Sequence, residues 1–239
     1  MTHILSRRGA LLAAATLVLG AAVAVLAAQA KRDFRDVLAP VQLAISVLVP
    51  FFGVLAVTGP RPPDSGRLAV TGPRLRDADR LSVTGPQPLD WDRRLGGRLL
   101  GAEGLAAGFA LVGVLLAAIA TALFCGSWPS ASQVVLLVVG SVLVQLIAQS
   151  VGTACGLLVR RPLIAMAATI VVPMGVTVVL GAIDSGGGLV RWLTPYGNAQ
   201  ALLAGKPTAA LAVVGLLWCV LPNAVGARQR RPALVGPRR

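Results

Sequence analysis

Six long apolar runs constrain the fold of this chain more than any other feature. A helix needs about 20 apolar residues to cross a hydrocarbon layer about 30 Å thick, and inside lipid a helix satisfies its own backbone hydrogen bonds. No Lys, Arg or Asp lies inside any of these runs. The runs therefore predict an all-α, polytopic membrane protein with six transmembrane helices. Their ranges are 9–29, 37–57, 99–124, 133–159, 162–183 and 208–227.

The composition agrees with this prediction. Charged residues make up 13% of the 239 residues and hydrophobic residues 56%, whereas a soluble domain carries about 25% charged residues. A formal net charge of +13 is typical of nucleic-acid-binding domains. Here, however, the basic residues lie outside the apolar runs, in the connecting and terminal segments, as membrane topology requires. We therefore expect no nucleic-acid partner.

The distribution of Lys and Arg predicts the orientation. With a cytoplasmic N-terminus, seventeen basic residues fall in cytoplasmic segments and five in outer ones. Cytoplasmic loops carry the excess of positive charge, so we expect a multi-pass protein of the plasma membrane with both termini inside (N-in/C-in). Residues 6–30 also resemble a signal peptide that ends in Ala-Gln-Ala. Their apolar stretch of ~20 residues exceeds the ~7–15 of a signal peptide, which favours a retained first helix.

A 13-residue unit occurs three times between residues 55 and 93, as LAVTGPRPPDSGR, LAVTGPRLRDADR and LSVTGPQPLDWDR. Its Thr-Gly-Pro step opposes a continuous helix, and a Pro- and Gly-rich repeat with few apolar residues buries too little surface to fold alone. The repeat is predicted to be a cytoplasmic linker. A docking platform with regularly spaced Arg and Asp is the alternative.

The repeat leads into residues 89–100, LDWDRRLGGRLL, which mix apolar and basic side chains. This mixture predicts a short interfacial helix, broken or bent at Gly96-Gly97, before the third span. The alternative is that the arginines only anchor the end of the span at the lipid headgroups.

The fourth run carries a polar stripe. Its members recur every four residues and therefore share one helix face; they are Ser141, Gln145, Gln149 and Thr153. Gly152 and Gly156 lie beside the stripe in a small-xxx-small pattern that favours close helix packing. Gly97/Gly101 and Gly104/Gly108 repeat that spacing in the third span. Two interpretations of the stripe remain open, helix–helix contact and the lining of a translocation path.

Glu103 is the single glutamate of the sequence and lies near the start of the third span. A carboxylate inside a membrane is a candidate functional group. Its closeness to the boundary equally suits a structural ion pair with Arg98, Arg160 or Arg161.

Residues 184–207 are too polar to span a membrane and too apolar for an ordinary loop. Trp192 and Tyr196 suit the outer headgroup level. We expect two half-helices, 189–193 and 197–204, joined at a Thr-Pro turn and re-entering the outer leaflet.

The residues that most enzymes need are missing from this sequence. The single histidine is His3, there is no GxxxxGK[ST] loop and no CxxC pair, and three cysteines form no framework. We therefore expect no catalytic residue, no metal and no cofactor. A proton-coupled carrier is disfavoured for the same reason, because it needs buried carboxylates or histidines.

The layout resembles that of ABC transporter permeases of the second (exporter) type. The resemblance covers nearly the whole chain, and its most specific parts are DRRLGGRLLGAEGLAAG at the third span, the polar fourth span, and WLTPYGNAQALLAG before the last span. The triplicated linker departs from the family, whose members have a compact, partly helical connection there.

The resemblance implies a bacterial membrane-spanning subunit that forms the export path and pairs with a second copy or paralogue. A separate ATP-binding subunit would dock at residues 89–98, with Asp90, Trp91, Asp92, Arg93 and Arg94 as contact candidates. The alternative from another class is a non-transporting membrane scaffold whose arginine-rich cytoplasmic face binds anionic lipids or a soluble partner. A third, a secondary carrier, requires Glu103.

Overall fold

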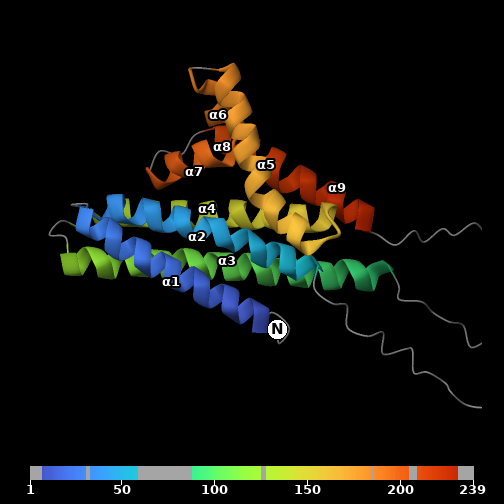
Figure 1. Cartoon of the computed structure of the whole chain (residues 1–239), viewed down its shortest axis with the longest axis horizontal. Coiled ribbons are helices and arrows are strands. Elements are labelled where there is room, and N and C mark those ends of the chain that lie inside the picture. The colour runs from blue at the N-terminus through green and yellow to red at the C-terminus, as the bar shows by residue number, and fades with distance from the viewer. Residues whose placement is uncertain are drawn as a thin grey trace, which may run out of the picture.

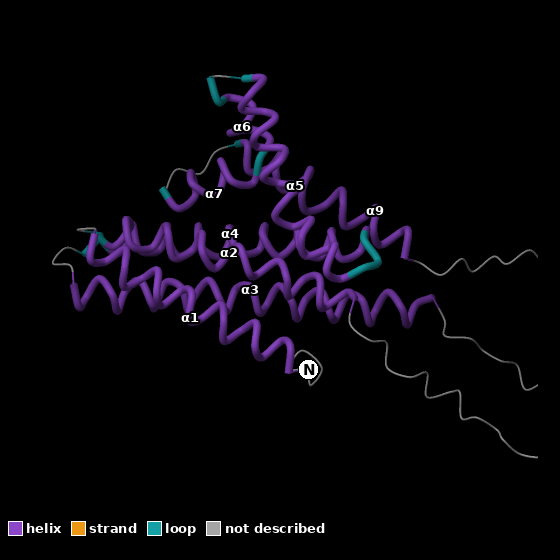
Figure 2. Tube along the Cα trace, in the orientation of Figure 1, coloured by secondary structure: helices purple, strands orange, loops and turns teal. Residues whose placement is uncertain are grey.

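The computed structural model describes residues 7–30, 33–58, 88–124, 128–184, 186–204 and 209–230, without the side chains of residues 8 and 88–94. The described segments are mainly helical, with no strand among them (Figure 2). The elements are α1 (Arg7–Ala30), α2 (Phe34–Thr58), α3 (Pro88–Phe124), α4 (Ala131–Leu158), α5 (Pro162–Ile183), α6 (Gly188–Leu193), α7 (Pro195–Leu203), α8 (Ala210–Val214), the π-helix η1 (Gly215–Val220) and α9 (Leu221–Arg230).

The prediction of an all-α chain with six membrane-length helices is confirmed for the described residues. Six helical stretches are long and apolar enough to cross a bilayer: α1 to α5, and the continuous run of α8, η1 and α9. All six apolar runs of the sequence lie on these helices. The orientation of the helices relative to a cytoplasm stays a prediction. We call the two ends of the bundle the Phe34 end and the Thr58 end.

The core lies around α2, which packs against α1, α3 and α4 (Figure 1). A continuous face of α2 is fully buried, including Val37, Val41, Ile45 and Val49 at 0% exposure. These positions repeat every four residues, so one stripe of β-branched side chains supplies much of the contact. Phe52 adds a tilted ring contact with Phe109 of α3, with 5.2 Å between ring centroids.

Helices α2 and α4 approach each other closely at three glycines. A Cβ on Gly152 would overlap the carbonyl of Pro50, and one on Gly156 would overlap Val57. A Cβ on Gly53 of α2 would lie 2.7 Å from the backbone nitrogen of Thr153. Only glycine fits such backbone-to-backbone contacts, so the close packing predicted from Gly152 and Gly156 is confirmed.

Two expectations for the third span were wrong. Helix α3 continues through Gly96 and Gly97 without a break over 37 residues, because a glycine costs a helix only about 1 kcal/mol and keeps its backbone N–H. The predicted close packing also does not occur among the described residues at three of its four glycines, since a Cβ on Gly97, Gly104 or Gly108 would meet no described atom within 4 Å.

Helix α5 leans away from the α2–α4 layer, and the short helices α6 and α7 lie beside it (Figure 1). Among the residues of α5, Ala165 and Thr169 are the buried ones. The last span contains a π-helical segment that ends at Val220, two residues before Pro222. Proline supplies no backbone N–H, so the ordinary i to i−4 bond at that position is missing, and a wider turn precedes it.

Candidate functional site

The polar stripe of α4 lies at a seam with α2, α3 and α9. All four of its members are buried, at 0% exposure for three and 2% for Thr153. Ser141 at the Phe34 end donates to the carbonyl of Leu137 in its own helix, 2.8 Å away. The other three members bond to neighbouring helices.

Gln149 of α4 forms hydrogen bonds with the backbone of α2 on both sides of Pro50. With its amide nitrogen facing the carbonyl of Val49, it donates across 2.7 Å, and its oxygen accepts from the N–H of Gly53 across 3.0 Å. Val49 and Gly53 are the two groups that an undisturbed helix would join directly. Gln149 of α4 therefore bonds to both ends of one backbone step of α2.

Gln145 begins a chain of amides that crosses three helices. Its Nε2 donates to the backbone and side-chain oxygens of Gln42 of α2, both 2.9 Å away. Gln42 in turn donates to the carbonyl of Ala110 of α3 over 2.8 Å. The Oε1 atom of Gln145 is buried and has no partner among the described atoms. Hydrogen bonds of this kind hold apolar helices together in lipid.

Closer to the Thr58 end, a second polar cluster joins α3, α4 and α9. Thr153 donates to Oδ1 of Asn223 over 2.8 Å, and Asn223 donates to the carbonyls of Ser150 and Cys219. Ser150 donates to Oε1 of Glu103 over 3.2 Å, and Oε2 of Glu103 is buried with no partner among the described atoms. The last span is thereby tied to α4.

The expected ion pair of Glu103 is not formed. Within the described part of the chain Glu103 bonds to Ser150 and pairs with none of the three arginines named above. The physical reason is helix rotation: α3 turns Glu103 toward the face of α4 that carries Ser150 and Thr153.

Arg230, at the end of the last span, caps α4. Its guanidinium donates to the carbonyls of Gly156, Leu157 and Val159 at 2.7, 2.9 and 3.3 Å. The final carbonyls of a helix lack intrahelical partners and carry partial negative charge, so a cation stabilises them. Arg230 is thus part of the fold, in addition to any role at a membrane surface.

The segment before the last span forms two short helices, α6 and α7, on either side of Thr194. Asp184 accepts from the N–H groups of Gly186 and Leu189, and Asn198 donates to the carbonyls of Arg191 and Thr194. Trp218 of the π-helix donates to the carbonyl of Leu193 over 2.7 Å. These bonds fix the turn; its depth in a membrane stays a prediction.

The coupling candidates lie on the first turns of α3, where the helix extends toward the Thr58 end beyond its neighbours (Figure 1). Their side chains lie outside the described part of the structure, as does the repeat between residues 59 and 87. They are Asp90, Trp91, Asp92, Arg93 and Arg94.

Sequence reasoning missed several residues that complete these clusters. Gln42, Asn223 and Arg230 each bond to α4 or α3 from 68 to 103 positions away in the chain. The isolated polar residue inside an apolar run was the available signal for Gln42 and Asn223. Among the described residues, no group of His, Cys, Asp and Glu is arranged to hold a metal ion.

Comparisons with protein families, with curated proteins and with solved structures give no match to this chain.

Proposed function

We propose that this chain is the membrane-spanning permease subunit of an ATP-driven exporter of the ABC type, acting in the plasma membrane. Two such subunits, identical or related, would pair, and a separate ATP-binding subunit would dock at residues 89–98. Closure around nucleotide would then shift α1, α2 and α5 and open an outward path.

The observation that carries the proposal is the pair of short helices between the fifth and sixth spans. In the resembling permeases a re-entrant hairpin precedes the last helix. Here α7 packs directly on α4: a Cβ on Gly140 would lie 2.8 Å from the carbonyl of Leu202, and Leu202 and Leu203 are buried against Val144. Irregular backbone at membrane depth requires such protein cover.

The basic Thr58 end supports the same proposal. Helices α2, α4 and α9 end there, and α3 and α5 begin there, so the positive-inside count assigns this end to the cytoplasm. The extended start of α3 would then face a cytoplasmic ATPase.

The test is to identify what co-purifies with the tagged chain from gently solubilised native membranes. A stoichiometric ATP-binding subunit is expected, and deletion of residues 89–98 should release it. Deletion of one repeat unit, residues 68–80, is the matched control, because it shortens the linker and leaves the docking segment. Absence of any ATPase would overturn the proposal.

The scaffold alternative is distinguished by its basic tail. Neutralising Arg228, Arg231, Arg238 and Arg239 should abolish lipid or partner binding by a scaffold and leave an exporter largely active. Arg230 is left unchanged in this variant because it caps α4. A secondary carrier is excluded if Glu103→Gln retains full transport.

A further inference from the structure

A pocket of about 130 Å³ lies between α2, α4, α5 and α7. The central residues of α2 and α4 line it, so it lies near the middle of the bundle along the helix axes. Every lining residue is uncharged. The pocket is separate from the polar seam, because no member of the α4 stripe lines it. An apolar cavity of about 150 Å³ holds a benzene ring, so this pocket has room for a group of about that size.

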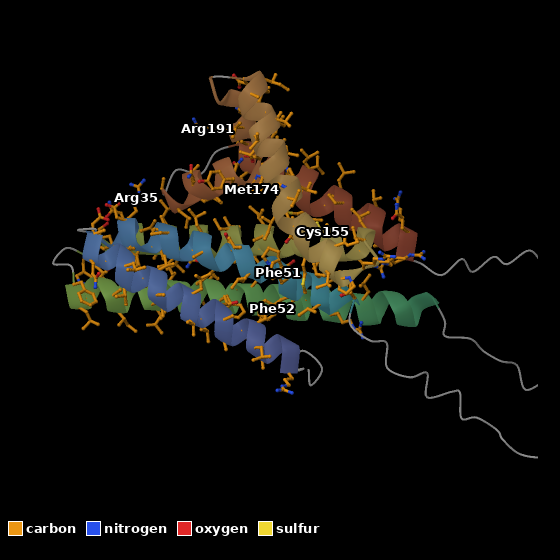
Figure 3. All side chains as sticks on the ribbon, viewed as in Figure 1. Arg35, Phe51, Phe52, Cys155, Met174 and Arg191 are labelled. Carbon is orange, nitrogen blue, oxygen red and sulfur yellow. The ribbon has the colours of Figure 1, made fainter. Side chains whose placement is uncertain are left out.

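Two helices bring the same motif to the pocket. Helix α2 contributes Ser46 and Pro50, from SVLVP, and α5 contributes Thr169 and Pro173, from TIVVP. In each case a hydroxyl residue stands four positions before a proline, and both members line the pocket. Figure 3 shows Met174, the neighbour of Pro173, above the α2–α4 layer.

The motif leaves hydrogen-bond acceptors without helical donors. A proline has no N–H, so the carbonyl four residues before it loses its ordinary partner. That carbonyl belongs to Ser46 in α2 and to Thr169 in α5. In apolar surroundings an unpaired backbone acceptor is costly, and a donor from another group lowers that cost.

The hydroxyl groups beside these carbonyls offer no free donor. Ser46 donates to the carbonyl of Leu43 over 2.7 Å, and Thr169 donates to that of Met166 over 2.7 Å. Each hydroxyl hydrogen is therefore in use, and what remains at both positions is acceptor capacity. A molecule that bonds to these carbonyls must therefore supply the hydrogen-bond donor itself.

A second pocket shares one lining residue with the first. Leu43 lines both, and the second pocket, of about 230 Å³, is bordered by Arg35, Asp36 and Gln200. Arg35 lies toward the Phe34 end (Figure 3), so the second pocket lies nearer that end of the bundle than the inner pocket does. Tyr196, which is about half exposed, stands at the rim of the inner pocket.

We propose that the inner pocket is a binding site for a neutral, ring-sized apolar group that carries a hydroxyl donor, such as a phenol. The ring fills the apolar volume, and its hydroxyl donates to the carbonyl of Thr169, which Pro173 leaves without its helical donor. The pocket lining contains no cationic side chain that could bind an anion and no carboxylate that could bind a cation. The inference goes beyond the export proposal, because it concerns binding alone and holds without an ATPase.

The test is photolabelling of the purified full-length chain in lipid nanodiscs with 4-azidophenol, followed by peptide mapping. Labelling is expected on peptides of α2, α5 and α7 that line the pocket. Phenol should compete about threefold to tenfold better than anisole, which has the same ring and no donor, since one hydrogen bond contributes about 0.5–1.5 kcal/mol. Equal competition by the two, or labelling confined to other surfaces, would overturn the proposal.

Two pairs of variants separate a specific site from general partition into lipid. Ala148→Leu fills the pocket and should abolish the competed labelling, whereas Ala167→Leu on the exposed side of α5 should not.

Pro173→Ala restores the N–H that bonds to the carbonyl of Thr169 and should reduce the preference for phenol over anisole toward one. Pro162 stands in the first turn of α5, where its missing N–H leaves no carbonyl of that helix without a partner. Pro162→Ala should therefore leave the preference unchanged. An unaltered preference in Pro173→Ala and labelling retained in Ala148→Leu would show that the ring binds elsewhere.

Discussion

Helices α2 and α5 contain the same hydroxyl-x-x-x-proline motif in opposite surroundings. In α2 a whole face is buried and a side chain of α4, Gln149, bridges the ladder beside Pro50. In α5 two residues are buried, and Val171, Val178 and Ile183 are 65–71% exposed. Each proline removes one backbone N–H from its helix, but only in α2 does a neighbouring helix supply hydrogen bonds beside the proline. We expect α2 to tolerate almost no change along this seam and α5 to tolerate many.

The largest effect is expected for Gly152→Ala in α4. The added Cβ overlaps the carbonyl of Pro50, so the backbones of α2 and α4 must separate, at a cost of about 3 kcal/mol or more. The measurement is the yield of monodisperse protein and its thermal unfolding midpoint in detergent. Gly108→Ala in α3 is the matched control, because its Cβ meets open space. Equal behaviour of the two variants would contradict the close contact of α2 and α4.

The second effect concerns Gln149→Leu. The substitution keeps the side-chain size but removes the two hydrogen bonds to the carbonyl of Val49 and the N–H of Gly53, which should cost about 2 kcal/mol. A lower unfolding midpoint is expected, with faster hydrogen exchange at Gly53. The exposed Gln200, which bonds to Tyr196 in its own helix, provides the control Gln200→Leu. If both variants unfold at the same temperature, α2 does not depend on the bridge from α4.

The third effect is local to the end of α4. Arg230→Ala removes the cap from three carbonyls and should cost about 1 kcal/mol. Hydrogen–deuterium exchange should accelerate in the last turn of α4, which these carbonyls terminate. Arg228→Ala changes the same charge at an exposed position and should leave that exchange unaltered; a matching acceleration there would assign the effect to net charge.

The contrast between the two helices also explains what sequence could predict. Hydropathy along one segment sufficed for the six spans, and the glycine spacing of α4 sufficed for its close contact with α2. The partners of the polar stripe could not be predicted, because Gln42 and Asn223 meet α4 only through the rotation and tilt of separate helices. The same limit applies to Glu103, whose partner Ser150 is 47 positions away. The break expected at Gly96-Gly97 failed because glycine weakens a helix without removing a hydrogen bond.

The smallest effect is expected for Val178→Ala in α5, and it sharpens the comparison most. Val178 is 68% exposed, and in a membrane such a side chain contacts lipid tails that are as apolar as the protein, so no hydrophobic force is lost when it is shortened. Val49→Ala at the fully buried face of α2 should cost about 1–3 kcal/mol, and Val178→Ala less than about 0.5 kcal/mol.

The comparison is made on unfolding midpoints of the protein at low and high concentration. If Val178→Ala destabilises the protein as much as Val49→Ala does, and only at high concentration, the exposed face of α5 is covered by a second copy of the chain. The apparent contrast between α2 and α5 would then be a property of the isolated subunit, and the face of α5 would form the subunit interface that the export proposal requires.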